Sequence, residues 1–224
     1  MRRLLPIAFT LTLAVASAAC GSDSSDNSGG DAGPIKVGLI VSLTGNYSSL
    51  GTEDKKAVDL AVEEINAAGG VAGSKIELTV KDDKSAPDQS VLAFNEIKGD
   101  VDAVIGSPFS NSALATIPLV DREKIPYLSL TPADEQVNPV HPYVFVVPAT
   151  SATYAERMLQ YYKATGISKV AVAYDTRSSY AVAGFNGMKD KAAEYGVEIA
   201  VSEEFQTDAT EFGALFGHVR TAAP

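Results

Sequence analysis

The feature of this sequence that most constrains its fold is a regular alternation between short apolar runs and longer segments with helical periodicity. The run over residues 35–43 is β-rich and has the length of a strand, and the segment over 52–68 places its apolar residues on one side of a helix. Strands and helices joined by short connections are typical of a parallel sheet with helices on both faces, which predicts an α/β fold. The further elements expected up to residue 148 are strands over 75–80, 101–105, 125–130 and 142–147, with helices over 90–98 and from residue 111.

The alternation starts again after Pro148, which predicts a first α/β lobe over residues 35–148 and a second over 149–224. The second part contains only two clear strands, and a two-stranded unit buries little core and leaves an open sheet edge. We therefore expect the second lobe to be incomplete within this sequence. Its predicted elements are helices over 154–165, 179–195 and 211–221 and strands over 169–175 and 197–205.

The first residues are expected to lie outside the fold, as a signal peptide over 1–19. A basic start, MRR, precedes an apolar stretch that would span only about 20 Å as a helix, short of the roughly 30 Å hydrocarbon layer of a membrane. The stretch ends in SAAC, which resembles a bacterial lipobox and implies acylation of Cys20; ordinary signal cleavage beside an incidental cysteine is the alternative. Residues 20–34 are then the lipidated cysteine and a flexible tether rich in Gly, Ser and Asp.

Composition and motifs argue against several classes of function. Asp and Glu number 28 against 18 Lys and Arg, and the formal charge of -10 argues against nucleic acid or anionic lipid as a partner. The single cysteine cannot form an intrachain disulfide, and His141 and His218 lack metal-ligand spacing, so no metal or other cofactor is expected. Asp82 and Asp83 resemble a catalytic pair, but neighbours on an extended chain point to opposite faces. No GxSxG, phosphate-loop or GxGxxG motif is present, so nothing in the sequence supports an enzyme.

The segment GSPFSNSALAT, residues 106–116, joins a predicted strand to a predicted helix at the edge where parallel sheets bind ligands. The first N–H groups of a helix lack intrahelical partners and favour an anion such as a carboxylate, and the Ser110 hydroxyl can add a donor. Helix capping by Ser110 or Asn111 is the alternative. Phe109 either lines a pocket or belongs to the core, and the pattern does not decide between the two. Pro118 is expected to kink or interrupt the helix.

Several of these segments together resemble the type I periplasmic solute-binding proteins of ABC importers, in the branched-chain amino acid group. The resemblance rests on IKVGLIVSLTGNYSSLG, AVDLAVEEINAAGGVAG, AVIGSPFSNSALA, IPYLSLTPA and KVAVAYDTRSSYAVAGF, in that order. It implies two lobes joined by hinge strands that close on a small solute, with first-lobe hydroxyls and backbone amides holding the carboxylate of an amino acid. The positions that match the family's ligand contacts are Ser110, Thr131, Ala133, Leu50 and Tyr180, and Phe109 and Asn111 beside them are kept as further candidates.

The resemblance also implies a receptor rather than an enzyme, which delivers a small polar solute, such as an amino acid or an amide, to an ABC permease. Its expected location is the outer face of the bacterial cell membrane, held there by a lipid on Cys20, or the periplasm. Two alternatives stay open, namely a ligand-sensing domain of the same fold and an exported α/β enzyme. The acidic second-lobe contact that the family uses for the ammonium group of a solute is expected beyond residue 224.

Overall fold

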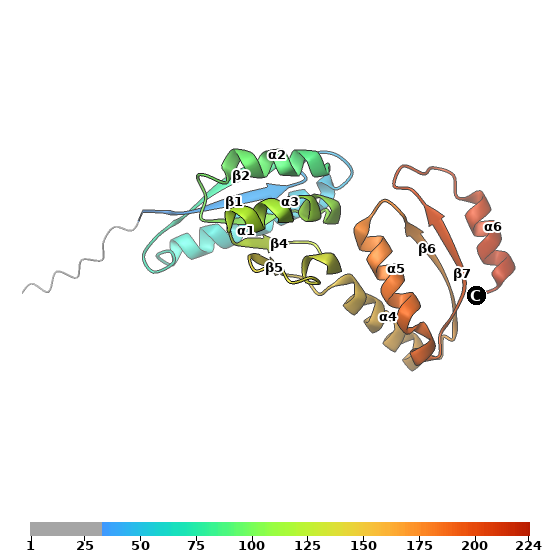
Figure 1. Ribbon diagram of the computed structural model, residues 1–224. Helices are drawn as coiled ribbons and strands as arrows, with labels where there is room; N and C mark the ends of the chain where they lie inside the picture. The colour runs from blue at the N-terminus through green and yellow to red at the C-terminus, as the bar shows by residue number, and fades with distance from the viewer. Residues whose placement is uncertain (1–32) are drawn as a thin grey trace, which may run out of the picture. The chain divides into compact units, whose positions relative to one another are not determined.

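The computed structural model describes residues 33–224, so the predicted signal peptide, Cys20 and most of the predicted tether lie outside the described residues. Within this part strands and helices alternate along the chain (Figure 1), and two parallel sheets result, which confirms the predicted α/β class. The strands are β1 (Ile35–Val41), β2 (Ile76–Asp82), β3 (Ala103–Gly106), β4 (Tyr127–Ser129), β5 (Val144–Val146), β6 (Lys169–Asp175) and β7 (Glu198–Phe205). The helices are α1 (Ser48–Ala67), α2 (Pro87–Ile97), α3 (Ser110–Glu123), α4 (Ser151–Thr165), α5 (Ser179–Lys191) and α6 (Gly213–Ala222), with short 3-10 turns η1 (Asp134–Gln136) and η2 (Ala192–Tyr195).

The first sheet contains five parallel strands in the order β2-β1-β3-β4-β5. Apolar side chains of α2 and α3 pack with those of the strands and form the larger buried core. The parallel arrangement brings the carboxyl ends of all five strands to one edge. The register places Val41 opposite Asp82 and Ile40 opposite Gly106, so the loops that follow β1, β2 and β3 begin side by side.

The second sheet pairs β6 with β7 in parallel, and the described residues contribute no further strand to it. Helices α4 and α5 contact each other, and the buried core of this part is small, built around Leu159, Ala192 and Val197. The ring of Tyr174 on β6 stacks on that of Phe185 on α5, with 4.2 Å between the ring centroids. A sheet of two strands with a small core is what the sequence predicts for an incomplete second lobe.

Helix α1 begins at Ser48, earlier than the predicted start at Thr52. Gly45 adopts the left-handed conformation, with a φ of +84°, and its carbonyl accepts a hydrogen bond from the Ser48 N–H at 3.2 Å. Gly51 allows the first turn of α1 to approach β1, because a Cβ at this position would lie 2.1 Å from the carbonyl oxygen of Ser42. The first turn of α1 therefore packs on the carboxyl end of β1.

The other helices follow the predicted positions with shifted ends. Helices α2 and α4 also begin before their predicted starts, at Pro87 and Ser151, and the predicted helix over 179–195 is divided into α5 and η2. The interruption considered for Pro118 is not found, since α3 continues through it. Pro118 is exposed, so water can satisfy the helix carbonyl that loses its N–H partner. No helix within residues 33–224 combines the length and the apolar character needed to span a membrane.

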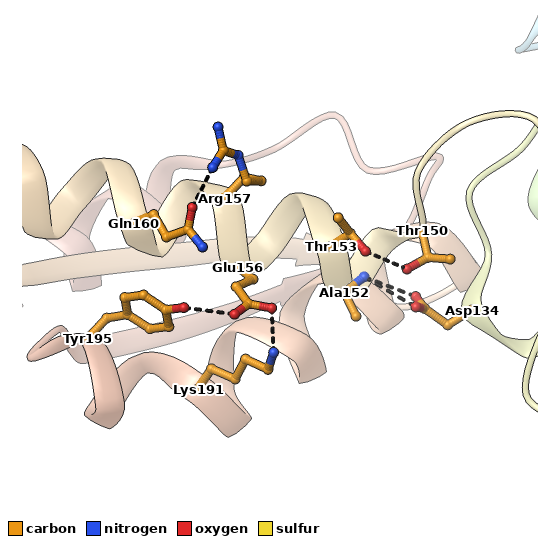
Figure 2. A network of polar contacts seen from close by, with 9 residues as sticks. All are labelled: Asp134, Thr150, Ala152, Thr153, Glu156, Arg157, Gln160, Lys191 and Tyr195. Carbon is orange, nitrogen blue, oxygen red and sulfur yellow. Dashed lines mark hydrogen bonds and ion pairs between the residues drawn. The ribbon is translucent and has the colours of Figure 1, made fainter.

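The start of α4 is fixed by the segment that follows β4. The Ser151 N–H donates a hydrogen bond to the Pro132 carbonyl at 2.8 Å. The carboxylate of Asp134 accepts from the Ala152 N–H at 3.1 and 3.4 Å, and Figure 2 shows it at the first turn of the helix. Because the first N–H groups of a helix have no intrahelical partner and carry partial positive charge, this carboxylate is the cap that α4 lacks from its own residues.

Beyond its first turn, α4 is joined to the following helix by one carboxylate. Glu156 pairs with Lys191 at the end of α5 and accepts a hydrogen bond from the Tyr195 hydroxyl at 2.7 Å (Figure 2). These hydrogen bonds and the Lys191 charge lower the pKa of the Glu156 carboxyl below its ordinary value, which keeps it ionised. Helix α4 is therefore held at its start by the segment after β4 and further along by α5 and η2.

Candidate functional site

A buried carboxylate joins the first three loops at the carboxyl edge of the first sheet. Asp83, directly after β2, is fully buried and accepts hydrogen bonds from the hydroxyls of Ser42 at 2.6 Å and Ser107 at 2.5 Å, and from the Ser85 N–H at 2.9 Å. Ser42 directly follows β1 and Ser107 directly follows β3. Charge-assisted hydrogen bonds of this kind are stronger than neutral ones, so Asp83 fixes the three loops relative to one another.

The loop after β3 is also held from β4. The phenol oxygen of Tyr127 accepts a hydrogen bond from the Ser107 N–H at 3.1 Å, and the Ser107 hydroxyl oxygen accepts one from the Phe109 N–H at 3.3 Å. Burial raises the pKa of Tyr127 well above its ordinary value, so its phenol is neutral at physiological pH. The backbone that leads into α3 is therefore positioned by buried polar groups before α3 begins.

The neighbouring carboxylate, Asp82, serves a different loop. It accepts hydrogen bonds from the N–H groups of Leu43 at 2.8 Å and Lys84 at 2.8 Å, and from both the N–H and the hydroxyl of Thr44. Burial opposes ionisation of Asp82, but these hydrogen bonds prevail and lower its pKa below the ordinary value. Asp82 and Asp83 therefore have separate partners, as their alternation along an extended chain predicts.

Two hydroxyls form a pair at the start of α3. The hydroxyl oxygens of Ser110 and Thr131 lie 2.5 Å apart and both residues are buried, at 3% and 1% exposure. Only one of the two hydrogens lies between the oxygens, so the pair keeps a second O–H that can donate elsewhere. Ser110 is the first residue of α3, and no side chain among the described residues caps this helix. The uncapped helix start and the spare hydroxyl hydrogen together favour an anionic group.

This hydroxyl pair lines a cavity of about 370 Å³, within the range of roughly 300–1,000 Å³ that is usual for small-molecule sites. Five of the predicted ligand contacts lie in its wall, four from the first part of the chain and one from α5. These five are Ser110, Thr131, Leu50, Phe109 and Tyr180. The remaining wall consists of Tyr47, Asp54, Pro108, Leu130, Pro132, Tyr154 and Ser178.

Phe109 lies in the wall of the cavity and stacks on a ring that the sequence did not single out. The centroids of Phe109 and Tyr47 are 4.3 Å apart, with an interplanar angle of 19°. The Tyr47 N–H donates to the Ser85 hydroxyl at 3.0 Å, which ties this ring to the loop that Asp83 organises. Burial is the main cause that raises the pKa of Tyr47, so this wall of the cavity carries no phenolate charge at neutral pH.

Two predicted contacts lie outside the wall of this cavity. Ala133 is fully buried, and its carbonyl accepts a hydrogen bond from the Gln136 side-chain amide at 3.1 Å. The side-chain amide of Asn111 donates to the carbonyl of Arg177 at 2.7 Å and accepts from the N–H and the hydroxyl of Ser179 at 3.0 and 2.9 Å. Asn111 thus connects α3 to the start of α5, and a ligand contact by either residue stays a prediction.

The predicted contacts do not include Tyr47, Asp54, Tyr154 and Ser178, which also lie in the wall. The sequence favours an ordinary turn at Tyr47 and offers residues 150–154, which include Tyr154, for either hinge and ligand contacts or helix capping. It presents Ser178 as a hydroxyl without a histidine at a matching spacing, and no pattern singles out Asp54. Asp54 does lie four residues after Leu50, and such residues share one face of a helix. This spacing brings Asp54 to the cavity only because α1 begins before Leu50.

Comparison with known proteins shows the family to which the chain belongs. The family model described as periplasmic binding protein matches residues 34–224, which is nearly all of the described chain. The chain belongs to the periplasmic binding protein family. Its fold is that of the type I members in the branched-chain amino acid group, as the resemblance predicts.

Three relatives of this periplasmic binding protein are informative. The leucine-, isoleucine-, valine-, threonine- and alanine-binding protein of Pseudomonas aeruginosa is 27% identical over 84% of the chain and 51% of its own length. The substrate binding protein LivJ of Streptococcus pneumoniae, solved in complex with isoleucine, superposes with a TM-score of 0.74 at 27% identity, over 84% of this chain and 54% of its own. A solute binding protein of Rhodopseudomonas palustris, solved with 3,4-dihydroxybenzoic acid, gives 0.76 at 25% identity, over 85% and 52%. The chain thus spans about half the length of these relatives.

Proposed function

We propose that this periplasmic binding protein is an exported receptor that binds a small solute with a carboxylate group, an amino acid first of all, and delivers it to an ABC importer. The observation that carries the proposal is the Ser110–Thr131 hydroxyl pair at the uncapped start of α3, inside a cavity of suitable size. The solutes of the two solved relatives, isoleucine and 3,4-dihydroxybenzoic acid, both carry a carboxylate.

The proposed mechanism is solute-driven closure of two lobes. Ser110 and Thr131 contribute to the cavity from the first lobe, and Tyr154, Ser178 and Tyr180 contribute from the part after residue 148. A solute that touches both sets binds more tightly when they are close, and only such a difference in affinity can shift the equilibrium toward a closed state. The permease then recognises the closed state, and no bond in the solute is made or broken.

A screen of solutes tests this function. A soluble form that starts at Gly21 is expected to gain thermal stability with at least one member of a panel of amino acids, amides, urea and aromatic acids, because a ligand that binds only the folded state stabilises it. Isothermal titration calorimetry then measures the affinity, and chromatography of the solute after incubation checks that it is unchanged. Conversion of a solute into a product would support the exported enzyme, and absence of binding to the whole panel would contradict the receptor.

The anchor on Cys20 is a separate part of the proposal, because Cys20 lies outside the described residues. Replacing Cys20 with alanine is expected to move the protein from the membrane fraction to the soluble fraction of the producing cells, since the acyl chains attach through the thiol. Immunoblots of the two fractions measure this, and Ser22→Ala, two residues further along the tether, serves as the control. Continued membrane retention of the Cys20→Ala protein would contradict lipidation.

A further inference from the structure

One charged side chain lines the candidate cavity. Among its described wall residues, Asp54 alone has an acidic carboxyl or a basic side chain, and the rest are apolar, hydroxyl-bearing or aromatic. Asp54 lies on α1, four residues after Leu50, and both line the cavity, which places them on one face of the helix. An anionic group in this position is unexpected beside an anion-favouring helix start, unless the solute carries a positive charge as well.

The carboxylate of Asp54 has no hydrogen bond or ion pair with any described residue, although two lysines follow it directly. Lys55 pairs with Asp59 at 2.5 Å and Lys56 pairs with Glu53 at 2.8 Å, so each lysine is engaged with another carboxylate. Asp54 is partly buried, and this burial raises the pKa of its carboxyl above the ordinary value, since desolvation disfavours the charged form. The protein thus has a partly desolvated carboxyl group without a described partner at the wall of its cavity.

We propose that Asp54 is a specificity-determining residue that holds the ammonium group of the solute, so that the site selects amino acids over carboxylic acids without an amino group. The proposal rests on the proposed function. The hydroxyl pair of Ser110 and Thr131 takes the solute carboxylate, and Asp54 in the same cavity takes the ammonium. An ammonium group would give Asp54 the partner that it lacks, while a second anion without an ammonium would meet its repulsion.

The experiment compares one amino acid with its analogue that lacks the amino group. The amino acid of the panel that binds most tightly is used, and for leucine the analogue is 4-methylpentanoate. Asp54→Asn removes the charge and keeps the shape, and Glu53→Gln makes the same change at the adjacent, exposed position of α1. Asp54→Asn is expected to weaken binding of the amino acid about 10- to 100-fold. Its affinity for the analogue is expected to stay within about twofold of that of the unmodified protein, or to rise. Glu53→Gln is expected to change the affinity for neither compound.

Two further measurements separate specificity from folding. The melting temperature of each variant without solute shows whether it is folded, and Asp54→Glu, which keeps the charge, is expected to retain the preference for the amino acid. Equal weakening of both compounds, no weakening of either, or equally tight binding of both by the unmodified protein would overturn the ammonium assignment while leaving a solute receptor in place. Binding of no panel member by the unmodified protein would instead contradict the proposed function itself, and the assignment with it.

Discussion

Replacing Asp83 with alanine is expected to lower the free energy of unfolding by about 3–4 kcal/mol, because two buried hydroxyls and one partly buried N–H lose the acceptor that they share. The hydroxyls of Ser42 and Ser107 and the N–H of Ser85 all donate to this one carboxylate, in a place that water does not reach. Chemical denaturation followed by circular dichroism measures the change. The Asp83→Asn protein keeps one acceptor oxygen, so its free energy of unfolding is expected to lie between those of the unmodified protein and of Asp83→Ala.

The control for this prediction is Asp100→Ala, which removes a carboxylate from an exposed position and is expected to change the free energy of unfolding by less than about 0.5 kcal/mol. Solute affinity is expected to fall in Asp83→Ala as well, because the loop that leads to Ser110 loses its fixed position. A loss of stability no larger than that of the Asp100 variant would show that Asp83 does not organise this edge of the sheet.

Ser110→Ala is expected to weaken binding of a carboxylate solute by about 1–3 kcal/mol, which is roughly 5- to 150-fold. The substitution removes the hydroxyl at the start of α3 and leaves that of Thr131 without its partner at 2.5 Å. Calorimetry measures the affinity. Thr131→Val is expected to have a similar effect, and the double variant less than the sum of the two, because hydrogen-bonded neighbours do not contribute independently.

Ser112→Ala is the matched control for Ser110→Ala. Ser112 lies two residues further along α3, and its hydroxyl is buried without a hydrogen-bond partner among the described residues. Removing that hydroxyl is expected to leave solute affinity unchanged and to keep or slightly raise the stability, since a buried polar group without a partner costs free energy. Unchanged affinity in Ser110→Ala would remove Ser110 from the site.

The parallel sheet and the edge that carries the cavity follow from patterns that a sequence shows directly. Strand-like runs that alternate with helical periods imply a parallel sheet, and a parallel sheet collects its loops at one edge, so Ser110 and Thr131 were expected near each other. Asp83 could not be recognised in this way. Its partners Ser42 and Ser107 are distant in sequence, and only the register of β1 with β2 and β3 makes the three residues neighbours.

The position of Asp54 in the cavity wall could not be predicted, because it depends on where α1 begins. Periodicity places α1 from Thr52, which leaves Leu50 in a loop and gives no reason to put Leu50 and Asp54 on one face. The real start at Ser48 depends on Gly51, whose missing side chain allows close contact with Ser42. Such tertiary contacts at helix starts are invisible to an amphipathic pattern, which records only the side chains that pack along the helix.

The dependence of the loops on Asp83 distinguishes two groups of residues at the same edge of the sheet. Ser42, Asp83 and Ser107 need one another, so a substitution at one of them damages the other two. Asp54 has no described polar partner within the protein, and Leu50 and Tyr180 are about half exposed in the cavity wall. Substitutions in this second group can therefore be made one residue at a time, whereas substitutions among Ser42, Asp83 and Ser107 have consequences for all three loops.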